Sequence, residues 1–304
     1  TLLNEEQIQQ THQYALRILS ETGVRVGSPS VVEMLEKTKQ VEVQGRSVKM
    51  SADLVERTIQ SAPSTIQMYD RRGSPVFNLG DGRLRFGVGV TALYYQEPVS
   101  DNLEPFTRQH MRDLTRLGSV LPLYDVISTP GIVRDVPEHL GDLYGSLEHF
   151  ANTTKPLVLL VSDENNFAPV LDMFEHLHGG LGDHPFVLPY FNPVSPLVMD
   201  SGTLLKMEVA IERGLPFIFS NYSMAGASTP LTPAGTLSLL LTELLAGVAV
   251  GFVTGERAPT TPTGLAYLVI PVASSLSMMP TVFAFKISRH TPMTLTLCFF
   301  SLSS

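Results

Sequence analysis

The sequence predicts an α/β fold: a (β/α)8 TIM-type barrel, incomplete at its C-terminus, with an N-terminal α+β extension. Four prolines each begin a short apolar segment, a helical pattern follows each segment, and the units recur about every 30 residues. The prolines are Pro122, Pro156, Pro185 and Pro216, which lie 34, 29 and 31 residues apart. A strand-then-helix unit at this interval indicates parallel strands with crossover helices. An open doubly wound sheet can show the same interval and stays the alternative.

Each proline-led segment has the character of a buried strand. Proline lacks an N–H and therefore belongs at the first residue of a strand, and a continuous apolar segment is typical of a strand buried on both faces. Pro156-Leu-Val-Leu-Leu-Val shows both features. We expect Ser201 to cap the third following helix and Thr232-Pro233 to open the fourth.

The N-terminal part, residues 1–105, is predicted to mix helices and hairpins. Helices are expected after Asn4, Ser28 and Ser51, with Asn4 and Gln7 forming a capping box. A hairpin is expected over Gln40–Met50 around Gly45. Short strands are expected over these ranges: Thr65–Asp70, Val76–Leu79 and Leu84–Val88. The repeated βα units then occupy residues 106–256.

The tail, residues 257–304, breaks this pattern. All 29 acidic residues precede it, so residues 1–256 carry 18 minus 29, or -11, whereas the tail carries +3. Such a shift is compatible with a linker, a membrane-associated end, or a frameshifted or truncated reading of further barrel units. We favour the last interpretation.

Composition excludes several classes of protein. The net charge is -8 and no Lys/Arg run stands out, so nucleic acid is not an expected partner. Cys298 is the only cysteine, which excludes intrachain disulfides and a Cys-rich zinc site. No signal-peptide pattern opens the chain, and we expect a cytoplasmic protein. The apolar stretch Leu237–Val253 is interrupted by Glu243, and we interpret it as a buried barrel helix rather than a membrane span.

A glycine motif follows the N-terminal region. Gly87-Val-Gly-Val-Thr-Ala92 matches G-x-G-x-x-A, but a strand and turn follow it rather than the helix that dinucleotide binding requires. We therefore do not expect NAD. Either the glycines allow a ligand to approach the backbone closely, or they form a plain turn.

In barrels the chemistry gathers where strands end. The four predicted strand ends offer these polar residues: Ser128, Thr129, Ser162, Asp163, Asn192, Ser195, Asn221, Tyr222 and Ser223. Neither Lys nor His is among them, which weakens a Schiff-base aldolase and leaves no obvious general base. Asp163 could simply cap its helix, and the loops at 192–197 and 225–233 could be structural. His176 and His178 are interpreted as a solvated helix end, and no metal is expected.

Four segments resemble the trimethylamine methyltransferase family, whose non-pyrrolysine members include glycine betaine:corrinoid methyltransferases. They are Asn4–Val26 with its Glu-Thr-Gly-Val-Arg-Val end, Phe86-Gly-Val-Gly-Val, Ser195-Pro-Leu197 and Gly226-Ala-Ser-Thr-Pro230. The resemblance spans residues 4–256. It implies methyl transfer from a methylated amine to the Co(I) corrinoid of a separate partner protein, with no cofactor bound covalently to this chain.

The catalytic residues cannot be named from the sequence, but candidates for substrate binding can. They are Gly87, Gly89, Thr91, Tyr94, Asn192, Ser195, Asn221, Tyr222 and Gly226. Aromatic faces and carboxylates usually hold a quaternary ammonium. Because the chain has no Trp, that role would fall to Tyr94, Tyr95, Tyr190, Phe191 or Tyr222. A homo-oligomer is compatible with the sequence. The alternatives are an inactive binding protein or truncated remnant of the family, and an unrelated barrel enzyme.

Overall fold

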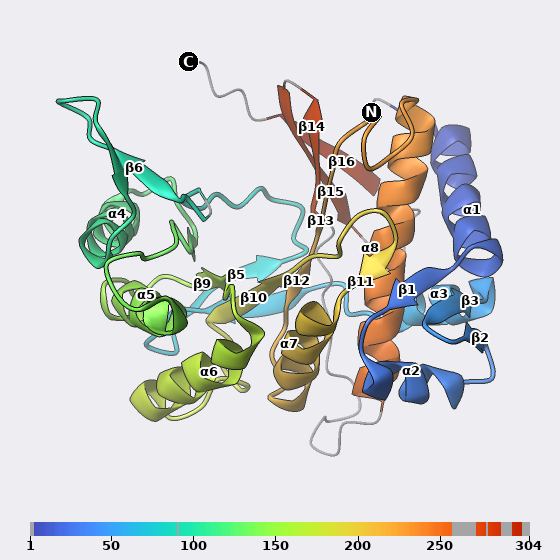
Figure 1. Cartoon of the computed structure of the whole chain (residues 1–304), viewed down its shortest axis with the longest axis horizontal. Coiled ribbons are helices and arrows are strands. Elements are labelled where there is room, and N and C mark those ends of the chain that lie inside the picture. The colour runs from blue at the N-terminus through green and yellow to red at the C-terminus, as the bar shows by residue number, and fades with distance from the viewer. Residues whose placement is uncertain (1–2, 90, 257–271, 278, 287–293, 300–304) are drawn as a thin grey trace. The chain divides into compact units, whose positions relative to one another are not determined.

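The computed structural model describes residues 3–89, 91–256, 272–277, 279–286 and 294–299, which form a mixed α/β fold (Figure 1). The chain divides into two compact units. The first unit combines residues 1–64 with residues 191–304, and the second unit comprises residues 65–190. The two units are taken in turn below.

Helix α8 (Pro233–Gly255) is the core of the first unit. It packs against α1 (Glu5–Glu21), α2 (Pro29–Glu36), α3 (Ala52–Ser61) and α7 (Ser201–Glu212), and Figure 1 shows α1 running beside it. A helix that is apolar on all sides is expected to be buried. Helix α8 is long and apolar enough to cross a membrane, yet 89% of its most apolar window is buried inside the fold, as in the core helix of a globular unit.

The expected helix starts are largely confirmed. Asn4 forms the capping box with Gln7, and Ser28, Ser51 and Thr232 each accept a backbone N–H from the first turn of their helices. Each such cap satisfies a donor that the first turn leaves unpaired.

The expected cap of α7 is wrong by one residue. Asp200 is the N-cap, and its Oδ1 accepts the N–H of Thr203 at 2.9 Å, so Ser201 is the first helical residue. Both residue types cap helices well, and the spacing of apolar residues could not distinguish between them.

One sheet joins the two sequence segments of the first unit. Strands β2 (Val41–Gln44) and β3 (Ser47–Met50) form the expected hairpin. Strand β1 (Val24–Val26) pairs antiparallel with β3 and parallel with β11 (Val198–Met199). The N–H of Arg25 donates to the Leu197 carbonyl at 2.8 Å, which fixes the loop before β11.

A second set of strands follows α7. Strands β12 (Ile218–Phe219) and β13 (Asn221–Ser223) are short, and β13 pairs in parallel with β14 (Val272–Ser277). Strands β15 (Met279–Lys286) and β16 (Thr294–Phe299) continue this sheet in antiparallel order. By the 30-residue interval of the sequence a further strand is due near Pro259, which lies outside the described residues, and the frameshift interpretation of the tail stays a prediction.

The second unit contains the predicted parallel strands. Strands β8 (Ile127–Ser128), β9 (Leu157–Leu159) and β10 (Val187–Phe191) pair in parallel in that order. Helix α5 (Gly141–Ala151), entered through the 3-10 turn Glu138–Leu140, connects β8 to β9, and α6 (Glu164–His178) connects β9 to β10. The strand-then-helix repeat is therefore confirmed here.

Two strand predictions need correction. Pro156 directly precedes β9, and Pro185 and Pro216 stand two residues before β10 and β12, but Pro122 lies in a turn five residues before β8. Pairing starts only at Val126, which bridges Gly87 in parallel. Asp125, the residue before Val126, contacts the same segment through its side chain, because its carboxylate accepts the Phe86 N–H at 3.0 Å.

The second correction concerns the range Leu84–Val88. This range is not a continuous strand, because only its Gly87 pairs with the sheet. The remaining elements of this unit are helix α4 (Arg108–Val120), the hairpin of β4 (Ile66–Tyr69) with β5 (Pro75–Leu79), and that of β6 (Tyr94–Gln96) with β7 (Leu103–Pro105).

Candidate functional site

A buried carboxylate marks the strand-end side of the first unit. Glu243 is the only charged residue of α8 and is 1% exposed. Its partners come from the loop after β10 and from β13, and Ser195, Asn221 and Ser223 are among the strand-end residues that the sequence singled out. We call the set Ser195, Leu197, Asn221, Ser223 and Glu243 the Glu243 centre.

Three donors converge on the Glu243 carboxylate. Ser195 Oγ donates to Oε2 at 2.7 Å, and the Leu197 N–H donates to Oε1 at 2.9 Å. Asn221 Nδ2 donates to Oε2 at 3.1 Å. Ser223 Oγ in turn donates to Ser195 Oγ at 2.8 Å, which fixes the serine that contacts the carboxylate.

The carboxylate is costly to bury in this position. Burial raises the pKa of Glu243, and the hydrogen bonds from Leu197, Ser195 and Asn221 oppose that rise only in part. Among the described residues, no Lys, Arg or His forms an ion pair with Glu243. A buried charge is normally paired, so one without a cation is expected to serve a purpose.

Asn221 is held in one orientation. Its Nδ2 also donates to the Leu240 carbonyl at 2.7 Å, so Nδ2 cannot exchange places with Oδ1. Oδ1 is buried and has no hydrogen-bond partner among the described residues. An unpaired buried acceptor costs free energy, so this oxygen adds to the cost of the buried Glu243 carboxylate.

The other candidates of the first unit lie around this centre but not in it. Asn192 is exposed, and its Nδ2 turns back to the Pro193 carbonyl. Tyr222 is 53% exposed, because its side chain alternates with the buried Asn221 and Ser223 along β13. Gly226 has a φ of 80° and forms a turn whose N–H donates to the Thr229 carbonyl.

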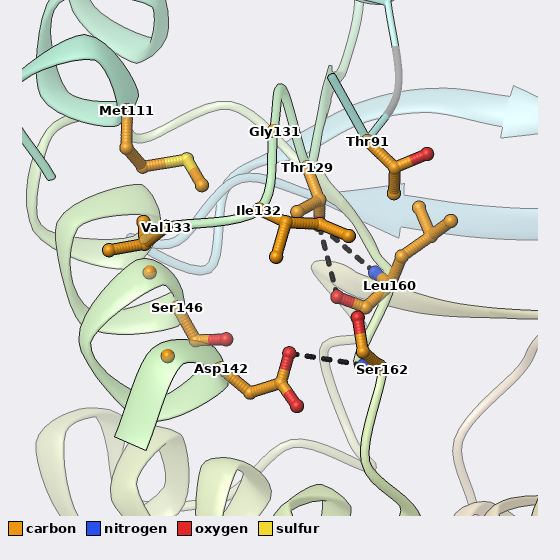
Figure 2. A pocket seen from close by; sticks show the side chains of 12 residues that line it. Thr91, Met111, Thr129, Gly131, Ile132, Val133, Asp142, Ser146, Leu160 and Ser162 are labelled. Atoms are coloured by element: carbon orange, nitrogen blue, oxygen red, sulfur yellow. Dashed lines mark hydrogen bonds between the residues drawn. The ribbon is translucent and has the colours of Figure 1, made fainter. Parts of the chain in front are cut away.

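The second unit holds a separate small pocket at the carboxyl ends of β8 and β9 (Figure 2). Loops after these strands, the start of α5 and Thr91 line it. Its lining consists of Thr91, Met111, Thr129, Gly131, Ile132, Val133, Gly141, Asp142, Gly145, Ser146, Leu160 and Ser162. We call it the Asp142 pocket.

Asp142 organises one wall of this pocket. Its Oδ1 accepts the Ser162 N–H at 3.1 Å, and Oδ2 accepts the Asp163 N–H at 2.9 Å. Asp163 itself caps α6 by accepting the Asn165 N–H. On the opposite wall, Thr129 Oγ1 accepts the Leu160 N–H at 3.0 Å. These hydrogen bonds thus fix the polar groups of the pocket to the loops that follow β8 and β9.

Of the candidate residues in the second unit, Thr91 lines the Asp142 pocket, whereas Gly87, Gly89 and Tyr94 do not. Tyr94 is 55% exposed on β6 with Arg134 5.8 Å above its ring. A Cβ on Gly87 would lie 2.9 Å from Ser128 Oγ, so this glycine allows close packing of a neighbouring segment rather than of a ligand. Nothing lies within 4 Å of the corresponding position on Gly89.

The sequence analysis missed two residues. Glu243 was taken only as an interruption of an apolar stretch, although a lone acid in such a stretch indicates a buried charge that needs partners. Asp142 lies at the start of α5, away from any strand end in sequence, and no local signal indicated that it contacts Ser162 and Asp163. No group of three or more His, Cys, Asp or Glu side chains is placed to hold a metal within the part of the chain that is described.

The fold and site together define an α/β protein whose polar groups gather where its strands end. A family model described as trimethylamine methyltransferase (MTTB) matches residues 1–266. The chain belongs to this family, and the resemblance seen in the sequence is confirmed.

Three curated relatives are similar to the chain. The trimethylamine methyltransferase MttB of Desulfitobacterium hafniense (strain DSM 10664 / DCB-2) is 28% identical over 89% of this chain and 57% of its own length. The glycine betaine methyltransferase of Desulfitobacterium hafniense (strain Y51) is 26% identical over 82% and 52%. The trimethylamine methyltransferase MttB1 of Methanosarcina mazei is 25% identical over 83% and 53%. The chain therefore spans about half the length of the curated relatives it matches.

Proposed function

We propose that the chain is part of a methyltransferase that moves a methyl group from a tertiary or quaternary methylated amine, of the trimethylamine or glycine betaine type, to the Co(I) corrinoid of a partner protein. Membership of the family and the names of its relatives support this reaction class. The observation in the structure that carries the proposal is the Glu243 carboxylate, which is buried and has no cationic partner among the residues that the structure describes.

The charge of the centre suits a cationic substrate. A quaternary amine is positively charged, and a tertiary amine is protonated at neutral pH. Attraction between opposite charges is stronger in the protein interior than in water, because the effective dielectric constant is lower there. We expect the amine to bind above Ser195 and Asn221, so that Glu243 balances its charge without direct contact.

The reaction needs alignment more than proton transfer. The C–N bond breaks with its electron pair remaining on nitrogen, and the methyl carbon bonds to the acceptor, which supplies both electrons. A quaternary amine then leaves as a neutral tertiary amine, and no proton is needed. Fixing the C–N bond in line with the acceptor is therefore the main task of the chain. The hydrogen-bonded loop of Ser195 and Leu197 provides a rigid wall for it.

Exposed apolar side chains on the same loops fit the partner and its corrinoid. Val194 and Tyr222 are 54% and 53% exposed, and Met224 and Leu231 are 48% and 79% exposed. Exposed apolar side chains of this kind suit the broad face of a macrocycle held by another protein. When docked, the corrinoid supplies the nucleophilic metal that accepts the methyl group.

Closure of the parallel strands into a TIM barrel is part of the same proposal. A wide barrel mouth would let the partner reach the strand ends. The cytoplasmic location and the division at residues 105 and 256 likewise stay predictions.

Turnover with free Co(I) cobalamin tests the proposal. The 304-residue chain is incubated with trimethylamine, glycine betaine and related amines, and methylation of the corrinoid is followed by its absorbance. Methylation with one of these amines supports the proposal. Amine binding in calorimetry without any methylation would instead support the inactive binding protein, and neither binding nor methylation would exclude both.

A further inference from the structure

We infer that Ser195 Oγ determines which end of the substrate faces the Glu243 centre, because this oxygen can receive a cationic nitrogen end but not a carboxylate. Ser223 is the positioning residue that holds the oxygen in place. The inference rests on the methylated amine of the proposed function. It follows from the direction of each hydrogen bond in the Glu243 centre.

The Glu243 carboxylate accepts hydrogen bonds on both oxygens. The Leu197 N–H lies on Oε1 and Asn221 Nδ2 lies on Oε2, and both of these groups can only donate. Ser195 Oγ lies 2.7 Å from Oε2. A hydroxyl beside an ionised carboxylate donates its hydrogen to it, and such a charge-assisted bond is stronger than one between neutral groups. The single hydrogen of the Ser195 hydroxyl therefore points to Glu243.

Ser223 occupies a second position on the same oxygen. Its hydroxyl donates to Ser195 Oγ at 2.8 Å, and Ser223 is 1% exposed. A hydroxyl oxygen offers one hydrogen and two lone pairs. Ser195 Oγ thus keeps one lone pair and no hydrogen, so towards a ligand it can only accept.

The remaining lone pair is polarised by the buried charge. Hydrogen bonds in a chain strengthen one another, and this chain ends on the Glu243 carboxylate, which is 1% exposed and has no cationic partner among the described residues. Ser195 itself is half-buried and follows the exposed Val194. A ligand at this loop therefore meets the negative charge of the centre through Ser195 Oγ.

The backbone of the loop keeps this oxygen in a fixed position. Leu197 has a φ of 59°, a left-handed conformation that is uncommon for a residue other than glycine. Its N–H donates to Glu243 Oε1 at 2.9 Å, and its carbonyl accepts the Arg25 N–H at 2.8 Å. Backbone strain of this kind clusters at ligand sites, where it holds a group in one orientation.

An acceptor without a hydrogen selects by charge. Methyl hydrogens beside a positive nitrogen can approach Ser195 Oγ through C–H···O contacts, and a protonated tertiary amine can donate its N–H to it. A carboxylate oxygen would bring its lone pair against that of Ser195 and would form no hydrogen bond. In a betaine, therefore, the nitrogen end faces Ser195 and the carboxylate points away from the Glu243 centre.

Calorimetry of the whole chain without corrinoid tests the inference with pairs of probes that share one shape. Choline is compared with tert-butylethanol, and glycine betaine with tert-butylacetate. In each pair a neutral carbon replaces the charged nitrogen, so only the charge of that end differs. We expect each nitrogen compound to bind about tenfold or more tightly than its carbon counterpart.

Variants of the two serines separate recognition from folding. Ser195→Ala should weaken choline binding about fivefold and leave tert-butylethanol binding unchanged, because the neutral probe gains nothing from the acceptor. Ser195→Thr keeps the hydroxyl and should restore the preference, and Ser223→Ala should fall between Ser195→Ala and the natural chain. Ser20→Ala, at an exposed position of α1, is the matched control.

Three results would overturn the inference. They are equal binding of the two members of a pair, equal weakening of choline and tert-butylethanol in Ser195→Ala, and no binding of any nitrogen compound. The turnover assay distinguishes this inference from the proposed reaction. Methyl transfer by a chain that shows no preference within a pair would overturn the inference alone, whereas preference without methyl transfer would contradict only the proposed reaction.

Discussion

Ser195 Oγ and the Glu243 carboxylate lie 2.7 Å apart although 48 residues separate them in the sequence. One side chain belongs to an exposed strand-end loop and the other to the core helix α8. Through this bond and the one from the Leu197 N–H, the core fixes the shape of the loop. The side of the first unit that we propose to face the substrate is thus shaped by a buried residue of the core helix.

A double-mutant cycle should reveal this coupling. Ser195→Ala and Glu243→Gln each remove part of the same interaction, so their effects on the free energy of unfolding should fall short of additive by about 1–2 kcal/mol. Urea unfolding of the two single variants and the double variant gives the coupling energy.

The exposed Glu36 at the end of α2 offers the control. Glu36→Gln combined with Ser195→Ala should be additive within experimental error. Additivity of Ser195→Ala with Glu243→Gln as well would show that the bond contributes nothing to folding.

His149 should make the fold sensitive to acid. It is 0% exposed, and burial lowers its pKa to about 4, while the hydrogen bond to the Ile127 carbonyl acts weakly in the other direction. The folded state therefore resists protonation. Stability from this residue is complete above pH 6.5, the ordinary pKa, and is lost as the pH falls through about 4, by about 3 kcal/mol in all.

Urea unfolding between pH 7 and pH 4 measures this loss. In His149→Gln, which can still donate to Ile127 but does not titrate, the decline over that range should be smaller by a comparable amount. His139→Gln, at an exposed position, should decline as the natural chain does. Parallel curves for His149→Gln and the natural chain would refute the assignment.

Two glycines of α8 should respond in opposite ways to alanine. A Cβ on Gly247 would lie 2.3 Å from Phe219 Cε1, a clash that neither the strand nor the helix can relieve cheaply. A Cβ on Gly251 would meet Phe217 Cζ at 3.3 Å. Gly247→Ala should cost about 1–3 kcal/mol or more, whereas Gly251→Ala gains helix propensity and should be close to neutral. Thermal unfolding of both variants provides the comparison, and equal Tm values would contradict it.

Lys155 should stabilise the end of α4. Its Nζ donates to the carbonyls of Gly118, Leu121 and Tyr124 at 2.9, 2.7 and 2.8 Å, so it ties the last turn of α4, which leaves carbonyls unpaired, to the turn that follows the helix. Lys155→Met should therefore lower the free energy of unfolding by about 1–3 kcal/mol. Lys39→Met, at an exposed position, should change it little. The prediction fails if the two variants unfold alike in urea.

Local features of the fold could be predicted because their causes are local. The Asn4 cap, the hairpin around Gly45 and the strand start after Pro156 each depend on residues within a few positions. Pro122 failed as a strand start because the limit of β8 is set from a distance, by the Asp125 contact with Phe86. Spacing along the chain carries no record of such a contact.

The residues of the candidate site also divide into those that local sequence indicated and those that only long-range contacts reveal. Ser195 and Asn221 were found because both follow a predicted apolar strand, and the chemistry of a barrel gathers where strands end. Their shared partner Glu243 was not found, because its contacts span 22 to 48 residues and only the fold brings them together. A lone acid within an apolar helix was the one available signal.

The most direct test of the central claim compares methyl transfer by Glu243→Gln with that by Glu36→Gln. The measurement is kcat/KM for the preferred methylated amine with Co(I) cobalamin. We predict a loss of about tenfold or more for Glu243→Gln, mainly through a higher KM, and an unchanged value for Glu36→Gln. A Glu243→Gln variant that is folded and retains the full kcat/KM would contradict the role assigned to this carboxylate.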